Sequence, residues 1–392
     1  MQTLEAVAQA MEAAQNTTPR SYLGMSQIGH ACDRNLWYSL RWVKQNRMTA
    51  TGLRNVQDGF AGEDVMAARL RMVEGIELHT SDPSKNDGSQ IEVKACNGHV
   101  SGHLDGAIHG IKETSDWCVW EHKQVGEKKF KQLQKLIEKD PVTALAEWDS
   151  IYFAQAHLYM GHTKMHSHFL TVASAGGRDI ISVITSFDVA VFERLMEKAQ
   201  RIVDASELPP RIGANAEDFA CKWCNHISVC HGTETPQVNC RTCAHSTPVK
   251  DAQWSCAKGS ASIPIQIQRT ACSSHLYIPP LLSNIADAVD GGNDYVVYAS
   301  KGDGRQFING PAPGFSSQEI FAAEHPVMLT DAGVQQLKTD IPEARLVSTV
   351  FDDMPSDDID SIKTKPLTAS ARKTKSDIRK AVAQIKDSEV PF

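Results

Sequence analysis

The sequence predicts an α/β fold in which a mixed central sheet is flanked by helices. Two strand-forming segments, 102–110 and 116–123, are separated by a short polar turn, and two more follow at 166–173 and 179–186. Segments with helical spacing of apolar residues lie between and around them, and the last of these covers about 188–205. Strands interleaved with helical segments are typical of a layered α/β domain.

Length, charge and cysteine content limit the class of protein. The 392 residues suffice for one large domain with additions, or for two domains and a tail. The formal net charge of -7 excludes a uniformly basic nucleic-acid coat, although local patches matter more for DNA binding. There is no basic-then-apolar signal pattern and no apolar run of membrane-spanning length. We therefore expect a cytoplasmic protein with no membrane partner, whose high cysteine content is better explained by metal binding than by disulfides.

The N-terminal region predicts two helices. Residues 1–16 have a helix-forming composition. Ser26 can cap a second helix, which would carry Cys32, Leu36 and Trp37. A lone cysteine in such a helix is usually part of the core, unless further cysteines elsewhere complete a metal site.

A further helix is predicted over 57–70. Phe60, Val65 and Leu70 would supply its apolar contacts. Glu63 lies in the same segment, four positions after a glycine, and by itself it would be a surface glutamate.

The strand predicted over 116–123 presents an apolar pair and a charged pair on one face. Alternation of side chains along a strand places Trp117, Val119, Glu121 and Lys123 on that face. The apolar pair would anchor the face in the core, and the charged pair would emerge where the core ends.

The preceding strand, 102–110, carries Asp105. A turn over 110–115 would fold the two strands into a hairpin and deliver Asp105 beside Glu121. Two carboxylates this close repel each other unless a divalent cation lies between them. A solvated strand end, with an ordinary ion pair to Lys123, is the alternative.

Two helices are predicted after this hairpin. The first, within 123–139, carries six lysines against two glutamates, so its outer face would be cationic and either track phosphates or simply be solvated. The second begins near Ile151 and places Gln155 and Tyr159 four residues apart on one face. Core packing alone would also explain that pair.

Three closely spaced cysteines form a ligand set that lacks one member. They are Cys221, Cys224 and Cys230, and Cys32 would supply the fourth thiolate across 188 intervening residues. Four thiolates of this kind can hold zinc tetrahedrally.

A second cysteine set begins ten positions on and has the spacing of a small zinc ribbon or knuckle. Its members are Cys240, Cys243, Cys256 and Cys272. His275, three residues beyond, could replace one cysteine, and free thiols are the alternative to zinc. Of the remaining cysteines, Cys96 and Cys118, we expect Cys118 to be buried core.

The central motifs resemble those of the PD-(D/E)XK nuclease superfamily. In that superfamily an Asp and a Glu-x-Lys on adjacent strands hold magnesium or manganese and position the attacking water, as Asp105, Glu121 and Lys123 would do here. Leu104 stands where the family pattern has proline, a departure that the superfamily tolerates. The resemblance implies a restriction-endonuclease-like core.

The RecB-like branch of the superfamily adds two motifs. One is a Gly-x3-His helix that supplies another metal-facing group, and Glu63 stands in the place of that histidine. The other is a Gln-x3-Tyr helix that contacts the nucleic acid and buttresses the active site, which Gln155 and Tyr159 match.

The order of the cysteines resembles that of the iron-staple exonucleases, which include the CRISPR-adaptation nuclease. In these proteins one cysteine precedes the catalytic motifs, three follow, and the four thiolates bind a 4Fe-4S cluster that clamps the ends of the domain. Cys32, Cys221, Cys224 and Cys230 match this order. The resemblance covers residues 21–232 and implies a 4Fe-4S cluster, with zinc as the alternative metal.

The C-terminal third is expected to be an addition to this core. Residues 281–350 predict a small α/β appendage with a helix near 331–339 and a strand at 346–351. Residues 351–392 form an acidic and then basic tail that we expect to be flexible. Its last residues, 387–392, resemble the acidic Pro-Phe tip by which bacterial single-strand-binding proteins recruit partners.

These expectations divide the chain into a nuclease domain with a 4Fe-4S staple, a zinc-ribbon-like module, the appendage and the tail, at 1–235, 236–280, 281–350 and 351–392. The implied function is a Mg²⁺- or Mn²⁺-dependent DNA exonuclease in DNA recombination, repair or phage DNA processing, acting on single-stranded DNA or free ends. No Gly-x4-Gly-Lys-Ser/Thr loop is present, so a helicase or recombination partner would be a separate chain. The alternatives are a non-catalytic DNA-binding or recruitment protein with the same stapled fold, and a zinc-only redox or scaffold protein.

Overall fold

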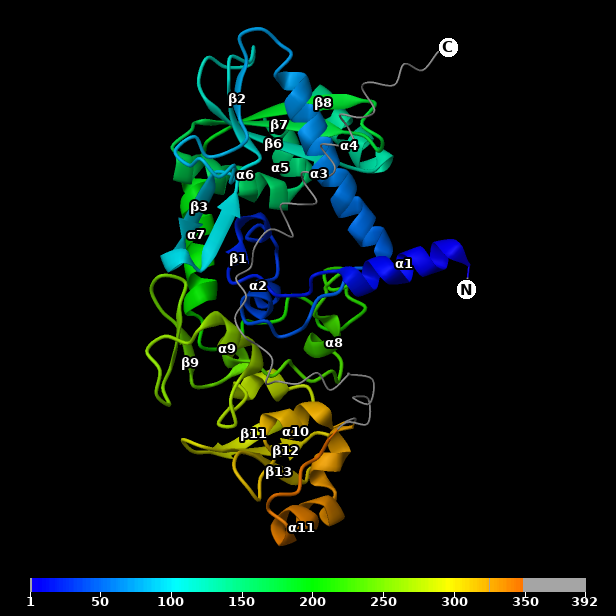
Figure 1. The fold of residues 1–392 in the computed structure, drawn as a ribbon, viewed down its shortest axis with the longest axis vertical. Helices are drawn as coiled ribbons and strands as arrows, with labels where there is room; N and C mark the ends of the chain where they lie inside the picture. Colours follow the sequence, from blue (N-terminus) through cyan, green and yellow to red (C-terminus); the bar gives the residue numbers. More distant parts are fainter. Residues whose placement is uncertain (1, 324, 348–392) are drawn as a thin grey trace. The chain divides into compact units, whose positions relative to one another are not determined.

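A computed structural model describes residues 2–323 and 325–347 (Figure 1). The predicted tail, 351–392, and most of the strand predicted at 346–351 lie outside the described residues. Among the helices that are described, none combines the length and the apolar character needed to cross a lipid bilayer. The predicted domain boundaries within the chain stay predictions.

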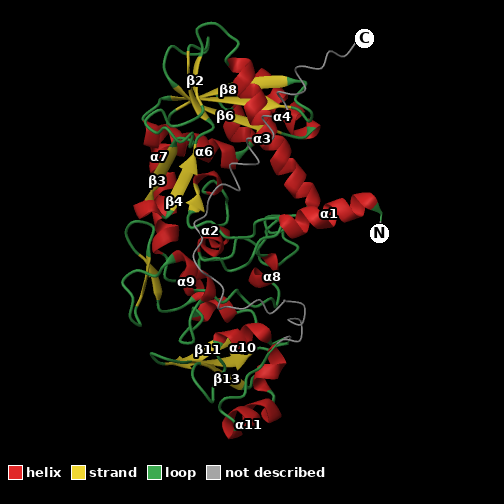
Figure 2. Cartoon of the chain, in the orientation of Figure 1, coloured by secondary structure: helices red, strands yellow, loops and turns green. Residues whose placement is uncertain are grey.

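The central sheet has five strands in the order β2-β5-β6-β7-β8 (Figure 2). Their bounds are Glu77–His79 for β2, Gly106–His109 for β5, Cys118–Gln124 for β6, Ser167–Ala173 for β7 and Ile180–Ser186 for β8. Strand β6 is antiparallel to β5 and parallel to β7, so the sheet is mixed as predicted. The strands predicted at 166–173 and 179–186 are confirmed.

Each face of this sheet is covered by helices. The end of α3 (Ala50–Leu70) packs Met66 and Leu70 against Trp120 of β6 on one face. On the other face, Val119 belongs to the large core that also contains Leu158 of α6 (Ser150–Thr163). The remaining helices of this half are α4 (Glu127–Lys139), α5 (Ala144–Trp148) and α7 (Val189–Asp204).

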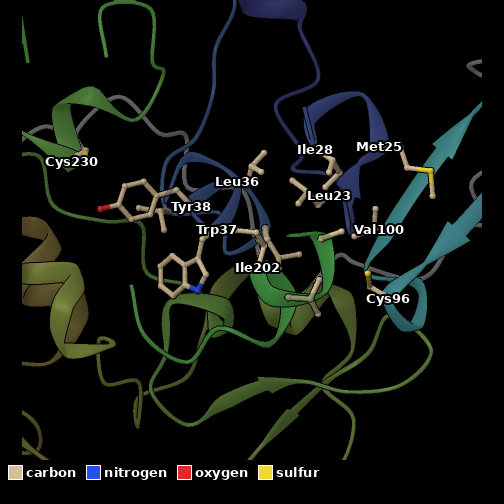
Figure 3. Close-up of a cluster of buried hydrophobic side chains, with 14 of the residues drawn as sticks. Leu23, Met25, Ile28, Leu36, Trp37, Tyr38, Cys96, Val100, Ile202 and Cys230 are labelled. Atoms are coloured by element: carbon tan, nitrogen blue, oxygen red, sulfur yellow. The ribbon is translucent and has the colours of Figure 1, made fainter. Parts of the chain in front are cut away.

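A smaller sheet, β1-β4-β3, connects the N-terminal segment to this core. Its strands are β1 (Leu23–Gly24), β3 (Glu92–Ala95) and β4 (Val100–His103). Helix α1 (Thr3–Ala14) precedes β1 in the sequence, and helix α2 (Asp33–Leu40) follows β1. Figure 3 shows Leu23, Met25, Ile28, Leu36 and Trp37 gathered with Val100 of β4 and Ile202 of α7. The N-terminal segment is therefore held by packing with two other parts of the chain, β4 and α7.

The cysteine-rich stretch after α7 has little regular structure. It contains α8 (Ile227–Cys230), the hairpin of β9 (Ser246–Pro248) and β10 (Trp254–Cys256), and α9 (Ile265–Thr270). Arg241 is fully buried there, donates hydrogen bonds to the carbonyl oxygens of Leu40 and Ser21, and stacks over Trp42 and Trp254. This arginine ties the stretch directly to the N-terminal segment.

The last described part is an antiparallel sheet with two helices. Its strands are β11 (Ala286–Gly291), β12 (Val296–Ser300) and β13 (Gln306–Asn309), and its helices are α10 (Ser317–Ala322) and α11 (Ala332–Asp340). Helix α11 confirms the helix predicted near 331–339. The α/β character of the predicted appendage is thus present in the described residues.

Three local predictions were wrong. The strand predicted over 102–110 is two strands, β4 and β5, because the chain leaves one sheet at Leu104 and Asp105 and enters the other. Helix α2 begins at Asp33, so Cys32 is its N-cap residue and Ser26 lies instead in a short 3-10 turn. Trp117 lies just outside β6.

The apolar contacts predicted for the 57–70 helix are only partly correct. Leu70 is buried, but Phe60 and Val65 are largely exposed. The buried residues of α3 are concentrated at its C-terminal end, where it crosses the sheet, so its middle has no core to pack against.

Candidate active site

Asp105 and Glu121 are brought together by the register of β5 and β6. Gly106 is paired with Trp120, so Asp105, one position before β5, lies across from Glu121. Asp105 Oδ2 accepts a hydrogen bond of 2.9 Å from the backbone N–H of His122, which fixes the carboxylate against β6. Leu104, immediately before it, is fully buried and anchors this crossing between the sheets.

Lys123 lies between the two carboxylates. Its Nζ donates a hydrogen bond of 2.5 Å to Glu121 Oε1 and is 3.8 Å from Asp105 Oδ2. The three predicted residues therefore form one cluster, in which the ammonium group partly neutralises two acids. Glu121 is only 3% exposed, whereas the side chain of Lys123 is 21% exposed, so the cluster opens to solvent at the lysine.

Helix α6 supports this cluster from the side. Gln155 Nε2 donates a hydrogen bond of 2.8 Å to Glu121 Oε1, and its second contact, at 3.3 Å, is Tyr159 Oη. Tyr159 Oη donates to the carbonyl oxygen of His103, two residues before Asp105. Gln155 and Tyr159 thus connect β6, which carries Glu121, to the end of β4, two residues before Asp105.

Gly102 makes room for this arrangement. A Cβ atom at this position would lie 2.5 Å from Tyr159 Cε1, which is far inside van der Waals contact. Sequence reasoning did not single out Gly102, because a glycine in a strand has many explanations and only the position of the tyrosine ring reveals this one.

The electrostatics of the cluster are dominated by burial. Burial and the nearby Asp105 raise the pKa of Glu121 to about 8, although Lys123 acts in the opposite direction. Burial opposes the charge on Lys123, but Glu121 and Asp105 together raise the pKa of its ammonium group. The cluster therefore holds its lysine charged and makes the ionised form of Glu121 costly when no other cation is present.

The cluster has the donors that a hard divalent cation prefers. Glu121 Oε2 is buried and has no hydrogen-bond partner among the described residues. Within 2–323 and 325–347, no group of three or more His, Cys, Asp or Glu side chains is arranged to hold a metal ion. Mg²⁺ is usually bound by one or two carboxylates together with water and substrate phosphates. Asp105 and Glu121 suit that mode, in which most ligands are not protein groups.

Glu63 lies in the same neighbourhood. Its Oε1 accepts a hydrogen bond of 3.4 Å from Gln90 Nε2, and its charge is one of those that raise the pKa of Glu121. The predicted role of Glu63 as a third metal ligand stays a prediction.

The first cysteine set lines a single cavity. Its members, Cys32, Cys221, Cys224 and Cys230, come from the start of α2, the loop before α8 and the end of α8. Cys224 is close enough to the other three that their charges would raise the pKa of its thiol, after burial as the largest cause. The four thiols therefore converge as predicted, but they are not arranged around one metal ion.

Three histidines line the same cavity and were not predicted as part of it. They are His30, whose Nδ1 accepts from the backbone N–H of Cys32, His226, and His231, whose Nε2 is 3.6 Å from Cys221 Sγ. No ligand spacing in the sequence distinguishes these histidines from solvent-facing ones.

The second cysteine set lines another cavity, formed by Cys240, Cys243, Cys256 and Cys272 together with His245 and His275. His245 Nε2 and His275 Nδ1 are buried and have no hydrogen-bond partner in the described part of the chain. Cys240 Sγ donates to the carbonyl oxygen of Ile267 instead. The donor chemistry suits zinc, although these side chains, too, are not arranged around one ion.

Comparisons with known proteins find structural neighbours at low identity and low TM-scores. No protein-family model matches the sequence, and no curated protein matches it. A structure described as the crystal structure of SSO0001 is 13% identical, with a TM-score of 0.31, over 59% of this chain and 96% of that chain. LHK-Exo in complex with dAMP is 12% identical, with a TM-score of 0.30, over 46% of this chain and 86% of that chain.

A third structure is the alkaline exonuclease LHK-Exo from Laribacter hongkongensis. It is 11% identical, with a TM-score of 0.30, over 50% of this chain and 90% of that chain. At these scores the likeness carries no weight for function, so the candidate site has to be judged by its own geometry.

The raised pKa of Glu121 predicts how stability depends on pH in the absence of metal. A carboxyl group whose pKa rises on folding, here from 4.5 to about 8, stabilises the fold most at low pH, and this contribution is lost as pH rises through that window. We expect the free energy of unfolding in EDTA to fall by up to ~1.4 kcal/mol per pH unit between about pH 5 and pH 8. Urea denaturation at a series of pH values measures this free energy of unfolding.

Two variants identify the group responsible. Glu121→Gln should flatten the fall in this window. Glu319→Gln should leave this fall in stability unchanged. Burial raises the pKa of Glu319, but hydrogen bonds from Lys338 and the backbone N–H of Ser316 outweigh it and lower the pKa. Glu319 therefore affects the pH dependence of stability only at acid pH. Equal slopes for the wild type and Glu121→Gln would show that Glu121 is not the titrating group.

Proposed function

We propose that the chain is a metal-dependent nuclease that hydrolyses phosphodiester bonds in DNA. The observation that supports this most is Glu121, a buried carboxylate beside Asp105 and Lys123, one oxygen of which has no hydrogen-bond partner in the part of the chain that the structure describes. Such a cluster is costly for folding, since burial and like charge both oppose ionisation of Glu121. A function that uses a bound cation explains why the cluster exists.

Each residue has a role in this proposal. Asp105 and Glu121 would hold Mg²⁺ or Mn²⁺, with Glu63 as a further candidate, and the cation would stabilise the charge that develops on the phosphate. Lys123, already hydrogen-bonded to Glu121, is placed to orient a water molecule and to donate to a phosphate oxygen. Gln155 keeps Glu121 in position, and Tyr159 keeps the chain before Asp105 in position.

The finer form of the proposal is an exonuclease for recombination, repair or phage DNA processing. It would act on single-stranded DNA or free ends, with any helicase or recombination partner supplied by another chain. The competing function is a non-catalytic DNA-binding or recruitment protein. The intact set of Asp105, Glu121 and Lys123, with its supporting hydrogen bonds, favours catalysis, because two adjacent acids with one lysine are costly to bury and a bound cation would offset that cost.

We also propose that the two cysteine sets hold metal. A 4Fe-4S cluster bound by Cys32, Cys221, Cys224 and Cys230 would fasten the start of α2 to the region around α8. In a cluster each thiolate binds a different iron, so the thiols need not surround one ion. Zinc in the second set would require Cys240 to turn from its contact with Ile267.

Replacement of Glu121 tests the nuclease proposal. Glu121→Gln keeps the size of the side chain and one accepting oxygen for Lys123 and Gln155 but removes the charge that holds the cation. We expect digestion of end-labelled single- and double-stranded DNA with Mg²⁺ or Mn²⁺ to fall about 100-fold or more. Gel electrophoresis of the products measures the rate and separates exonuclease from endonuclease cleavage.

The matched control is Glu319→Gln. Glu319 is equally buried and paired with a lysine, Lys338, at 2.8 Å, but in the C-terminal sheet region. We expect this variant to lose about 3 kcal/mol of stability and to keep its activity at low temperature. Wild-type protein without activity on any DNA in either metal would refute the nuclease proposal.

Metal analysis of two cysteine variants tests the metal proposal, because each serves as the control for the other. We expect anaerobically purified wild-type protein to be brown and to contain iron and zinc. Cys32→Ala should lose the iron and its visible absorption but keep the zinc. Cys256→Ala should lose the zinc but keep the iron and the visible absorption. Zinc in both sets would refute the cluster, and a protein without either metal would refute both assignments.

A further inference from the structure

Helix α4 carries a stripe of lysines that begins beside the candidate active site. The stripe consists of Lys128, Lys131, Lys135 and Lys139. Their spacing of three, four and four residues places them on one face of the helix. The opposite face buries Phe130 and Leu133 in the core, so the helix cannot turn the stripe away from solvent.

The charge of this helix is opposite to that of the whole chain. Its 13 residues include five lysines and two glutamates, whereas the chain has a formal net charge of -7. Lys131 is paired with Glu127 and Lys139 with Glu147, but these lysines remain about two-thirds exposed, at 64% and 67%. Lys128 and Lys135 are exposed and have no ionic partner among the described residues.

The first turn of the helix borders the catalytic cluster. Tyr152 lies between the two, with Lys129 Nζ 4.7 Å and Lys123 Nζ 5.6 Å from the centre of its ring. Lys129 is also paired with Asp149 at 2.6 Å and lies over Trp148, so it fastens the helix in place rather than belonging to the stripe. Lys128 follows the end of β6 by four residues.

We propose that the lysine stripe of α4 binds the phosphate backbone of the nucleic acid and leads it to the Asp105–Glu121–Lys123 cluster. This inference rests on the proposed nuclease function and specifies how that site holds its substrate. From Lys128 to Lys139 the helix rises about 16 Å, at about 1.5 Å per residue. A stacked strand has a phosphate about every 3.4 Å, so the stripe spans about five phosphates.

The contacts would be electrostatic and independent of base sequence. Lysine ammonium groups bind phosphate as point charges, and each contact releases counterions from the nucleic acid. The stripe therefore predicts a binding constant that depends strongly on salt and little on sequence. We therefore assign these lysines to substrate binding and not to the chemical step.

The experiment compares two quadruple variants that remove the same charge from different places. The test variant is Lys128→Gln, Lys131→Gln, Lys135→Gln and Lys139→Gln. The control carries Lys112→Gln, Lys164→Gln, Lys250→Gln and Lys301→Gln, all exposed lysines outside α4. Glutamine suits a helix surface nearly as well as lysine, so folding should be preserved, which circular dichroism checks.

The main readout is the slope of log Kd against log salt concentration for a labelled oligonucleotide. Binding is measured in the Glu121→Gln background with Ca²⁺, so that no cleavage occurs. We expect the slope of the test variant to fall by about 3, since each lost phosphate contact removes about 0.7 to 0.9, and the Kd at low salt to rise about tenfold or more. The control should change the slope by less than about 1.

Cleavage kinetics provide the second readout. In the active protein, the test variant should raise KM and leave kcat unchanged. Three outcomes would overturn the proposed role of the lysine stripe in substrate binding. They are an unchanged slope and KM in the test variant, equal changes in both variants, and a loss confined to kcat. The outcomes in KM and kcat require that the wild type cleaves DNA, whereas the salt slope is measured without cleavage. Failure of the stripe therefore differs from failure of the nuclease proposal, in which the wild type cleaves nothing.

Discussion

The burial of Glu121 in the middle of a mixed sheet is the constraint on which the rest of the site depends. Strand β6 is paired on both sides, antiparallel with β5 and parallel with β7, so the position of Glu121 cannot shift without breaking hydrogen bonds on two edges. The same pairing brings Asp105 opposite and leaves Lys123 as the charge that balances both acids. A carboxylate placed in this way is poorly solvated, and its remaining free oxygen favours a bound cation.

Support for this arrangement comes from parts of the chain that are far apart in sequence. Gln155 of α6 hydrogen-bonds Glu121 on β6, and Tyr159 of α6 hydrogen-bonds the end of β4, two residues before Asp105. Gly102 leaves space for the tyrosine ring. The N-terminal segment packs on β4 and α7 (Figure 3). Buried Arg241 joins the cysteine-rich stretch to that segment. The cysteine cavities lie in regions with little regular structure, where covalent metal ligation would have the largest structural effect.

Much of this architecture could be predicted from the sequence because its signals are local. The alternation in 118–124 fixed the face of Glu121 and Lys123, and the apolar spacing of α4 and α6 placed their helices. The predictions failed where contacts between distant parts of the chain determine the local structure. Nothing in 102–110 shows that the chain changes sheets at Asp105, and nothing near Phe60 shows that α3 extends beyond the core. The role of Gly102 and the histidines beside Cys32 depend on contacts that no local pattern encodes.

Anomalous diffraction from crystals soaked in Mn²⁺ tests the central claim most directly. The account predicts a single strong peak between Asp105 and Glu121, in contact with the free Oε2 of Glu121, and a Lys123 ammonium group that has moved away from Oε1. Crystals that take up manganese elsewhere, or show no peak within bonding distance of either carboxylate, would contradict it.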